Sequence, residues 1–540
     1  MNTQRVRNIL IFLIPIIVFF LFEIIFKKIG FDRVYNVIEN VIFASILLIM
    51  PIYFKNLNFK KVYIKFAYFV FTFCLFFETI YYYNFDAIFS SSSIFVLLET
   101  NASEAKEFFL SYLNKYNLTA IVLFIVILLI GILKIDVTDS KKQNKAITKF
   151  KWTFVVILFL AFLKISKFIV YNVPYLAIKT SVVYYQESQL LKVYGDENQI
   201  GNFLNVNRLI DLPEKELYIV VIGESISKDH FQLCSDYYRE TTPLLNKIRN
   251  DLTVCTDVIS PHAFTIGSLT KGLTLGNFEN PQAKYDGSII QLLNQADFNT
   301  YWISNQRPIG ISDTQITKIG KGAKTSVFLN IKHTSEKTPF DQVLVDELRE
   351  IVKEEGNNKV VFIHMLGAHI NYEKRYPSEF NYFKDKPTTK FNGKDVYNTI
   401  NSFDNVIRYT DYILHEIIEI AKEQGGSSFV LYFSDHGQEV YDEIDFFGQS
   451  VDKMVTKNMY EIPLFLWQSE YHKNSKVIQN QIDYKYMTDD IFHSIADLCF
   501  VSGQEIDVSR SIFNDAFKER KRIIKDSIDF DLDFKTVKLN

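Results

Sequence analysis

Five long apolar segments in the first third of the chain constrain its fold more than any other feature. They cover residues 9–26, 34–54, 62–83, 118–135 and 154–171, and each is close to the ~20 residues that cross a bilayer as a helix. The first lacks a small-residue cleavage site and is followed by four more, so we interpret it as a retained span rather than a signal peptide. The sequence therefore predicts a five-helix transmembrane domain over residues 1–172.

Basic residues next to these segments predict the orientation, because short loops rich in Lys and Arg stay in the cytoplasm. They precede the first span, follow the second and follow the fourth: Arg5, Arg7, Lys55, Lys60, Lys61 and "DSKKQNKAITKFK". Three basic residues between the first two spans contradict this orientation, because that loop would be external: Lys27, Lys28 and Arg33. An odd number of spans then places the chain after residue 172 outside the membrane.

Three further features of this half lead to expectations. Lys65 and Glu78 lie inside the third span, close enough to its ends for their charged groups to reach water. Residues 84–117 form an external loop with the apolar spacing of short amphipathic helices, and we expect this loop to lie on the membrane surface. Residues 173–215 are interpreted as a connector.

Strand-like and helix-like patterns alternate from residue 216 to the end. Strands are predicted for "ELYIVVI", "NTYWIS", "KVVFIHM", "SFVLYF" and "IPLFLW", and a crossover helix for residues 402–426. This alternation is typical of the α/β class, with a mostly parallel sheet sandwiched by helices. The second domain is expected to cover residues 216–540.

Polar side chains follow four of the predicted strands, at the sheet edge where α/β proteins place their chemistry. Glu224 follows the first, Asn305 the second, His364 and His369 the third, and Asp435 with His436 the fourth. A lone Asp-His pair after a strand is more often a turn device. The repetition at four strand ends favours a functional site instead.

The residue types at these ends suit a divalent metal ion. Two carboxylates and an imidazole are the usual ligands of Zn²⁺ when thiolates are absent, and the strand ends offer Glu224, Asp435 and several histidines. The stretch "SPHAFTIGSLTKGLTLGN" adds hydroxyls that a bound metal would activate as nucleophiles, among them Thr265, Ser268 and Thr270. Taken alone, that stretch is more often an ordinary helix start.

Charge and cysteine content exclude other classes. With 59 basic and 62 acidic residues, the net charge of −3 provides no basic field, so we expect no nucleic acid partner. The four cysteines have no C-x-x-C spacing and indicate neither a zinc ribbon nor a disulfide framework. A bridge between Cys234 and Cys255 is left open.

In the order of its motifs the chain resembles the phosphoethanolamine transferases, membrane-anchored members of the alkaline phosphatase and sulfatase superfamily. The resemblance covers nearly the whole chain and rests on the five spans, "ETNASEA", "VVIGESISKDHFQL", the threonine stretch, "IHMLGAH" and "YFSDHGQE". It implies a multi-pass protein of the bacterial inner membrane with a catalytic domain in the periplasm.

The resemblance also implies roles for individual residues. Glu224, Asp435 and His436 match the zinc ligands, and Thr265 matches the nucleophile that also contacts the metal, because Ser268 stands three residues later as in the family. His369 corresponds to the histidine that serves the leaving group, with His364 beside it as a second catalytic candidate. The substrate-binding candidates are Asn305, Ser268 and Lys228.

Three departures from the family pattern stand out. Pro261 and Lys271 occupy positions where many members have cysteines, Gly448 stands where another histidine is frequent, and Lys228 replaces an arginine. Whether one or two zinc ions bind is therefore left open.

The implied reaction is a transfer in two steps. Thr265 attacks the phosphorus of phosphatidylethanolamine, diacylglycerol leaves, and the phosphoethanolamine held on the threonine passes to lipid A, a lipopolysaccharide core sugar or another envelope glycan. The alternatives are a glycerol phosphate transferase of the lipoteichoic acid synthase kind and a membrane-tethered binding protein without catalysis. A true sulfatase is not expected, because neither "CSDYYR" nor "CTDVIS" fits Cys-x-Pro-x-Arg. The acceptor and the oligomeric state are left open.

Overall fold

The protein is described by a computed structural model that covers residues 3–27, 29–85, 87–89, 93–94, 110, 112–137, 145–190, 199–210, 212, 215–306, 315–330, 338–449, 455–532 and 534. The chain forms two compact units, of which the first reaches Gln186 and the second begins at Glu187.

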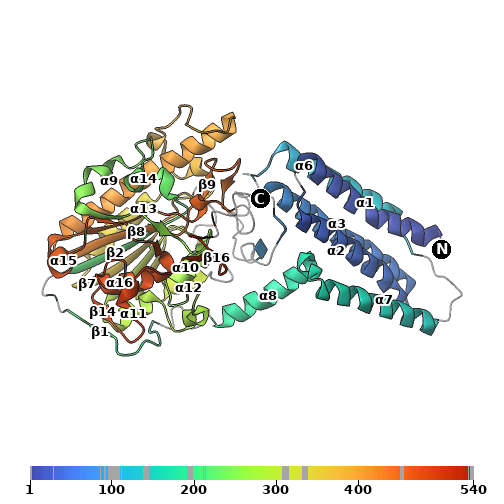
Figure 1. Cartoon of the computed structure of the whole chain (residues 1–540), viewed down its shortest axis with the longest axis horizontal. Helices are drawn as coiled ribbons and strands as arrows, with labels where there is room; N and C mark the ends of the chain where they lie inside the picture. Colours follow the sequence, from blue (N-terminus) through green and yellow to red (C-terminus); the bar gives the residue numbers. More distant parts are fainter. Residues whose placement is uncertain are drawn as a thin grey trace. The chain divides into compact units, whose positions relative to one another are not determined.

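The first unit consists of long apolar helices (Figure 1). Four of them are long and apolar enough to cross a membrane: α1 (Thr3–Phe26), α2 (Phe31–Ile49), α3 (Leu57–Phe85) and α6 (Lys115–Lys134). Helices α1, α3 and α6 pack against one another, and α2 packs on α1 and α3. These helices coincide with the first four predicted spans, so the chain carries a membrane anchor.

The fifth predicted span, residues 154–171, differs from the other four. Its residues fall on α7 (Lys145–Ile165) and the short 3₁₀ helix η2 (Phe168–Tyr171), which α8 (Val173–Leu190) follows. Helix α7 is 21 residues long, but within the described residues it is not among the four helices that meet the length and apolarity of a span. Lysines near both its ends, such as Lys149, Lys151 and Lys164, shorten its apolar stretch.

A buried ion-pair network links α1, α2 and α3. Arg33 donates to both carboxylate oxygens of Glu23 at 2.6 Å and to Glu78 at 3.1 Å, and the three side chains are at most 3% exposed. Asn40 and Thr79 donate to the same two carboxylates. The expectation that Glu78 reaches water is therefore wrong, because its carboxylate is neutralised inside the bundle; Lys65 is exposed as expected.

This network also explains why Arg33 disagrees with the orientation rule. A charge that is buried against two carboxylates is not a free loop charge, which is the kind that the rule counts.

The external loop predicted for residues 84–117, with its "ETNASEA" motif, lies mostly outside the described residues.

The second unit is built around an eight-stranded sheet with the order β12-β3-β11-β8-β2-β7-β5-β6. Its strands are β2 (Glu216–Gly223), β3 (Leu252–Cys255), β5 (Asn299–Ser304), β6 (Thr325–Phe328), β7 (Asn358–His364), β8 (Ser427–Ser434), β11 (Leu464–Gln468) and β12 (Gln481–Ile482). The central strands β8, β2, β7, β5 and β6 run parallel, whereas β11 is antiparallel to both of its neighbours. The predicted fold class is confirmed.

Helices cover both faces of this sheet (Figure 1). One face packs on α10 (Thr265–Gly272), α11 (Ile289–Gln295), α12 (Gln315–Lys321) and α16 (Ile491–Leu498). The other packs on α13 (Gln342–Lys353) and the long α14 (Lys394–Gln424), which contains the predicted crossover helix. Successive residues of β2 alternate between the two cores, for example Val220 in one and Val221 in the other. Burial on both faces explains why this strand is continuously apolar.

Shorter elements complete this unit. They are α9 (Pro243–Lys247), α15 (Glu470–Ser475) and four two-stranded ribbons, β1 (Asn207–Arg208) with β14 (Val501–Ser502), β4 (Val258–Ile259) with β13 (Tyr486–Met487), β9 (Glu439–Val440) with β10 (Phe447–Gly448), and β15 (Ile523–Ile524) with β16 (Ile528–Asp529).

Candidate metal and nucleophile site

Strand pairing brings the first two predicted ligands together. Gly223 of β2 pairs with Ser434 of β8 in parallel register, so the next residues, Glu224 and Asp435, emerge side by side from the same sheet edge. The Asp435 amide continues this pairing by donating to the Gly223 carbonyl at 3.0 Å. Both side chains are buried, at 2% and 0% exposure.

His436 completes a compact cluster with these carboxylates. Its Nε2 lies 3.4 Å from Asp435 Oδ2 and 3.8 Å from Glu224 Oε1. One ligand atom from each of the three residues lies within 4.8 Å of the other two. This spacing suits a single metal ion bound between them.

Hydrogen bonds around the cluster leave one buried carboxylate oxygen, Asp435 Oδ2, without a partner among the described residues. Asp435 Oδ1 accepts from the backbone amides of Ser225 and His436 at 2.8 and 2.7 Å, whereas the buried Oδ2 has no hydrogen-bond partner among the described residues. His436 Nδ1 lies 2.7 Å from the Gly437 carbonyl, which requires a proton on Nδ1 and leaves the Nε2 lone pair facing the carboxylates. These donors fit a zinc ion.

The electrostatics of the cluster also favour a cation. Burial raises the pKa of Glu224 well above its ordinary value, and the charge of Asp435 raises it further. Two buried carboxylates side by side repel each other unless a proton or a positive ion lies between them. A divalent cation offsets both charges at once.

Thr265 is the first residue of α10, and its hydroxyl belongs to the cluster. Its Oγ1 donates to Glu224 Oε2 at 3.2 Å, and the position at a helix N-terminus favours a bound anion such as phosphate. Thr270 differs, because its hydroxyl donates to Gln315 Oε1 at 3.0 Å and has no hydrogen bond to the cluster. This geometry favours Thr265 over Thr270 as the nucleophile.

Ser268 links α10 to the end of β8. Its side chain is 2% exposed and donates to the Asp435 carbonyl oxygen. This contact fixes the helix that carries Thr265 against the strand end that carries Asp435 and His436. The observed contact is one of positioning, whereas substrate binding by Ser268 stays a prediction.

The two predicted histidines of the third strand end occupy different environments. Burial lowers the pKa of His364 to about 4, although Asp435 opposes this shift, and its Nε2 has no partner among the described residues. Its ring lies 5.5 Å from that of Trp302. His369 is half-buried, and its pKa is lowered to about 3. The main cause is removal from bulk water, and the positive charges of Arg375 and His436 add to it. The Ala368 amide donates to the Glu224 carbonyl at 3.0 Å, so the loop that carries His369 lies beside the cluster.

The remaining predicted site residues make supporting contacts. Asn305 is fully buried and donates to the Pro339 carbonyl at 3.0 Å and to Asp341 at 2.8 Å. Asp341 in turn accepts from the backbone of Leu366 and Gly367, in the loop that leads to His369. The Lys228 ammonium group donates to the Thr256 carbonyl at 3.3 Å, and the structure shows no hydrogen bond from it to the cluster within the described residues. Their substrate roles stay predictions.

Sequence patterns missed three polar residues that surround the cluster. Gln306 donates to Glu224 Oε2 at 3.3 Å and to the Met365 carbonyl at 2.9 Å. Ser225 donates to Glu224 Oε1 at 2.6 Å from a left-handed backbone conformation with φ of 59°. Gln438 Nε2 donates to the carbonyls of Ser225 and Ala368. Ser225 and Gln306 stand one position after Glu224 and Asn305, at the ends of β2 and β5. The rule that polar residues at strand ends share one sheet edge therefore also points to them.

At the two positions where the resemblance implies cysteines, other contacts take the place of a disulfide. The four cysteines are free thiols, so the structure shows no bridge between Cys234 and Cys255. Lys271, at one of the two positions where the resemblance implies a cysteine, forms an ion pair with Asp526. The Lys525 amide donates to the carbonyl of Pro261, the other such position, at 3.1 Å. The C-terminal segment thus contacts both ends of the stretch that contains Thr265.

Comparisons with known proteins identify the family of this chain. The sulfatase family profile matches residues 216–500. The phosphoethanolamine transferase EptC of Escherichia coli strain K12 is 28% identical over 470 residues, covering 81% of this chain and 79% of EptC. The crystal structure of the C-terminal periplasmic domain of E. coli EptC in complex with Zn is 29% identical with a TM-score of 0.58 and covers 62% of this chain and 97% of that domain.

An integral membrane protein shares the fold. The integral membrane lipooligosaccharide phosphoethanolamine transferase A of Neisseria meningitidis matches with a TM-score of 0.65 at 18% identity, over 87% of this chain and 94% of that protein. At this identity the likeness concerns the fold alone.

Proposed function

This chain belongs to the sulfatase family, and we propose that it is a phosphoethanolamine transferase that uses phosphatidylethanolamine as donor and an acceptor in the bacterial envelope. The observation that carries the proposal is the Thr265 hydroxyl, which donates to Glu224 within a buried cluster of Glu224, Asp435 and His436. Lipopolysaccharide, through lipid A or its core, is the proposed acceptor. We further propose domains at 1–172, 173–215 and 216–540, with the last in the periplasm.

Glu224, Asp435 and His436 are the proposed ligands of Zn²⁺, with Thr265 as the fourth. When bound, the ion supplies a Lewis acid that lowers the pKa of a neighbouring hydroxyl and stabilises charge on phosphoryl oxygens. The unpartnered Oδ2 of Asp435 supports this assignment. Whether a second ion binds is a separate question, because the position of the frequent additional histidine holds Gly448.

In the first step, Thr265 Oγ1 forms a bond to the donor phosphorus while the bond from phosphorus to the diacylglycerol oxygen breaks. Its proton passes toward Glu224 Oε2, which already accepts its hydrogen bond. The free protein holds His369 neutral, since its pKa is lowered to about 3. The anionic donor phosphate raises that pKa, so that His369 takes up a proton and delivers it to the leaving diacylglycerol.

In the second step, neutral His369 accepts the proton of the acceptor hydroxyl as that oxygen attacks the phosphorus. The bond from phosphorus to Thr265 breaks, and the threonine recovers its proton. His364 is a second proposed proton carrier. The contacts of Ser268 and Asn305 support a positioning role, and Lys228 remains a proposed substrate contact.

The test is covalent labelling of the purified full chain with phosphatidylethanolamine. We expect phosphoethanolamine on Thr265 in the wild type, and neither label nor diacylglycerol release in Thr265→Ala, which removes the attacking oxygen. Thr270→Ala is the matched control, because it removes a hydroxyl of the same helix that is bonded to Gln315.

Each other outcome has a defined meaning. Label that survives in Thr265→Ala and disappears in Thr270→Ala would move the nucleophile to Thr270. Glycerol phosphate on Thr265 from phosphatidylglycerol, with no label from phosphatidylethanolamine, would identify the glycerol phosphate transferase instead. Absence of label and of diacylglycerol release in the wild type would favour a binding protein.

A further inference from the structure

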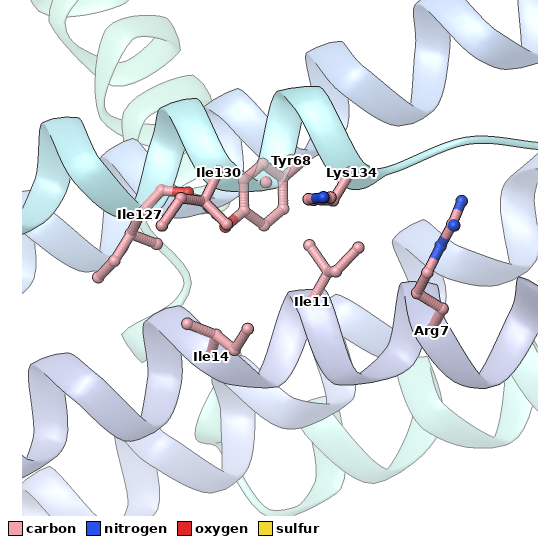
Figure 2. A pocket seen from close by; sticks show the side chains of 8 residues that line it. Arg7, Ile11, Ile14, Tyr68, Ile127, Ile130 and Lys134 are labelled. Carbon is pink, nitrogen blue, oxygen red and sulfur yellow. Dashed lines mark hydrogen bonds between the residues drawn. The ribbon is translucent and has the colours of Figure 1, made fainter.

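An apolar groove with two cations at one end lies in the membrane unit, far along the chain from the metal cluster. Its volume is about 310 Å³, and it is formed by α1, α3 and α6. Figure 2 shows Ile11 and Ile14 of α1 opposite Ile127 and Ile130 of α6, with the Tyr68 ring of α3 between them. The groove is therefore a slot between two helices with an aromatic floor.

The floor of this groove depends on a glycine. A Cβ at Gly131 would lie 2.0 Å from Cε1 of Tyr68, so only glycine lets the tyrosine ring lie flat against α6. The Tyr68 hydroxyl donates to the Ile127 carbonyl at 3.2 Å, which satisfies the one polar group of the floor. Between its walls the groove offers only hydrocarbon and no free polar group of Tyr68.

The charges of the groove lie at a single end. In Figure 2, Arg7 and Lys134 mark one end, and Ile14 and Ile127 mark the other. Both cations are exposed, and neither has a hydrogen bond or ion pair within the part of the chain that the structure describes. The nearby acid, Asp136, is already paired with Lys61 at 3.6 Å. This end therefore keeps an excess of positive charge.

We propose that this groove binds one anionic glycerophospholipid, with its phosphate between Arg7 and Lys134 and an acyl chain between the isoleucines. The helices that form the slot cross the membrane, so its axis runs parallel to lipid tails. From Arg7 to Ile14 the helix rises by about 10 Å, which matches a lipid whose charged head lies at the membrane surface and whose upper chain lies in the slot. Two unpaired cations favour an anionic headgroup over a zwitterionic one.

This proposal does not depend on the proposed transferase activity, because no groove residue belongs to the metal cluster. Its site is at the opposite end of α1 from Glu23 and the buried ion-pair network. The headgroup would lie in the leaflet that faces the cytoplasm if Arg7 is cytoplasmic as the sequence predicts.

The test uses the purified full chain in detergent, titrated with phosphatidylglycerol or phosphatidylcholine and examined by native mass spectrometry. We expect one phosphatidylglycerol molecule to bind at least about tenfold more tightly than phosphatidylcholine. The double variant Arg7→Gln, Lys134→Gln should lose about thirtyfold in affinity for phosphatidylglycerol, the effect of two charges near a membrane surface, and keep its affinity for phosphatidylcholine.

Two further variants separate the groove from general attraction. Lys55→Gln, Lys65→Gln removes the same charge from exposed positions of the same unit outside the groove, and should bind phosphatidylglycerol like the wild type. Ile14→Trp fills the slot while keeping both cations, and should weaken both lipids. Circular dichroism and gel filtration confirm that each variant is folded.

Three results would overturn the proposal. The first is equal binding of the two lipids by the wild type, and the second is an equal loss in the Lys55 and Lys65 control, which would show general charge attraction. The third is a lipid-free dimer that Ile14→Trp dissociates, which would make the groove an interface between two copies.

Discussion

Asp435 leads to the sharpest prediction for a single residue, because its buried Oδ2 has no hydrogen-bond partner among the described residues. Asp435→Asn and Glu224→Gln should each lower zinc affinity by more than about 100-fold, since the loss of a ligand exceeds the 10- to 100-fold effect typical of a supporting residue. Metal analysis of the purified full chain measures the zinc. Asp229→Asn, an exposed carboxylate five residues after Glu224, is the control and should keep its zinc. Full zinc content in both ligand variants would contradict the metal assignment.

Single residues show where the sequence was informative. Glu224, Asp435 and His436 were found because strand ends of a parallel sheet share one edge, and their proximity needed only the strand register. Asn305 follows the same rule, yet its side-chain amide donates to the Pro339 carbonyl and to Asp341 instead of contacting the cluster. The rule locates a residue at the edge but not the direction of its side chain. That direction depends on loop contacts between distant residues, such as Gln306 with Glu224.

A histidine bridge joins three elements of the soluble unit. His230, just after β2, contacts Asp404 of α14 at 2.7 Å and Asp442 of the loop after β9 at 3.0 Å. Burial alone would lower the pKa of His230, but Asp442 and Asp404 raise it well above its ordinary value. The bridge therefore stabilises the fold fully below the unfolded pKa near 6.5, and this contribution is lost as pH rises through the folded pKa.

His230→Gln should destabilise the soluble unit by about 1.5–3 kcal/mol at pH 6, because Asp404 loses a charged hydrogen-bond partner but keeps its ion pair with Arg239. It should also remove most of the fall in stability that the wild type shows as pH rises above 6.5. Urea unfolding followed by tryptophan fluorescence, in a Trp152→Phe background so that Trp302 and Trp467 report the soluble unit, measures both effects. His415→Gln, on α14 and outside the bridge, is the control. An unchanged pH dependence in His230→Gln would exclude the bridge as its source.

The network of Arg33 ties three membrane helices together in the same manner. Arg33→Met leaves Glu23 and Glu78 buried without their cation, so we expect a loss of about 3–5 kcal/mol in the stability of the membrane unit. Thermal unfolding in detergent, followed by helical circular dichroism, measures it. Lys27→Met, which removes a cation that follows α1 and lies over the Tyr83 ring, should cost less than about 1 kcal/mol. Equal midpoints for the two variants would mean that the network does not hold the helices.

Elements were predicted most accurately where one periodic pattern determines them. Four spans and the strands β2, β5, β7 and β8 follow from long apolar runs, whereas β3 and β12 are short and owe their place to pairing with distant residues. The pairing of Glu78 with Arg33 involves residues 45 positions apart on two helices. No local pattern contains that contact, which is why Glu78 was expected to reach water.

The organisation of the whole molecule depends on α7. With four crossings, the soluble unit would lie on the same side as the N-terminus, and with five it lies on the opposite side. Helix α7 has 21 residues and a length of about 31 Å, close to the ~30 Å hydrocarbon core. Lysine side chains near helix ends can extend to the interface, so Lys149, Lys151 and Lys164 do not prevent α7 from crossing. The buried ion pair of Arg33 also removes one of the three basic residues that disagree with the predicted orientation.

Two fusions of a reporter enzyme that is active only outside the cytoplasm decide between these arrangements. A fusion after Val137, which follows α6, should be inactive, and a fusion after residue 215, which follows α7 and α8, should be active, because one further crossing separates them. Lys149→Leu with Lys151→Leu lengthens the apolar stretch of α7 and should leave this pattern unchanged if α7 already crosses. Inactivity of both fusions would place the soluble unit in the cytoplasm, where a metal site that acts on envelope lipids has no access to acceptors on the outer side.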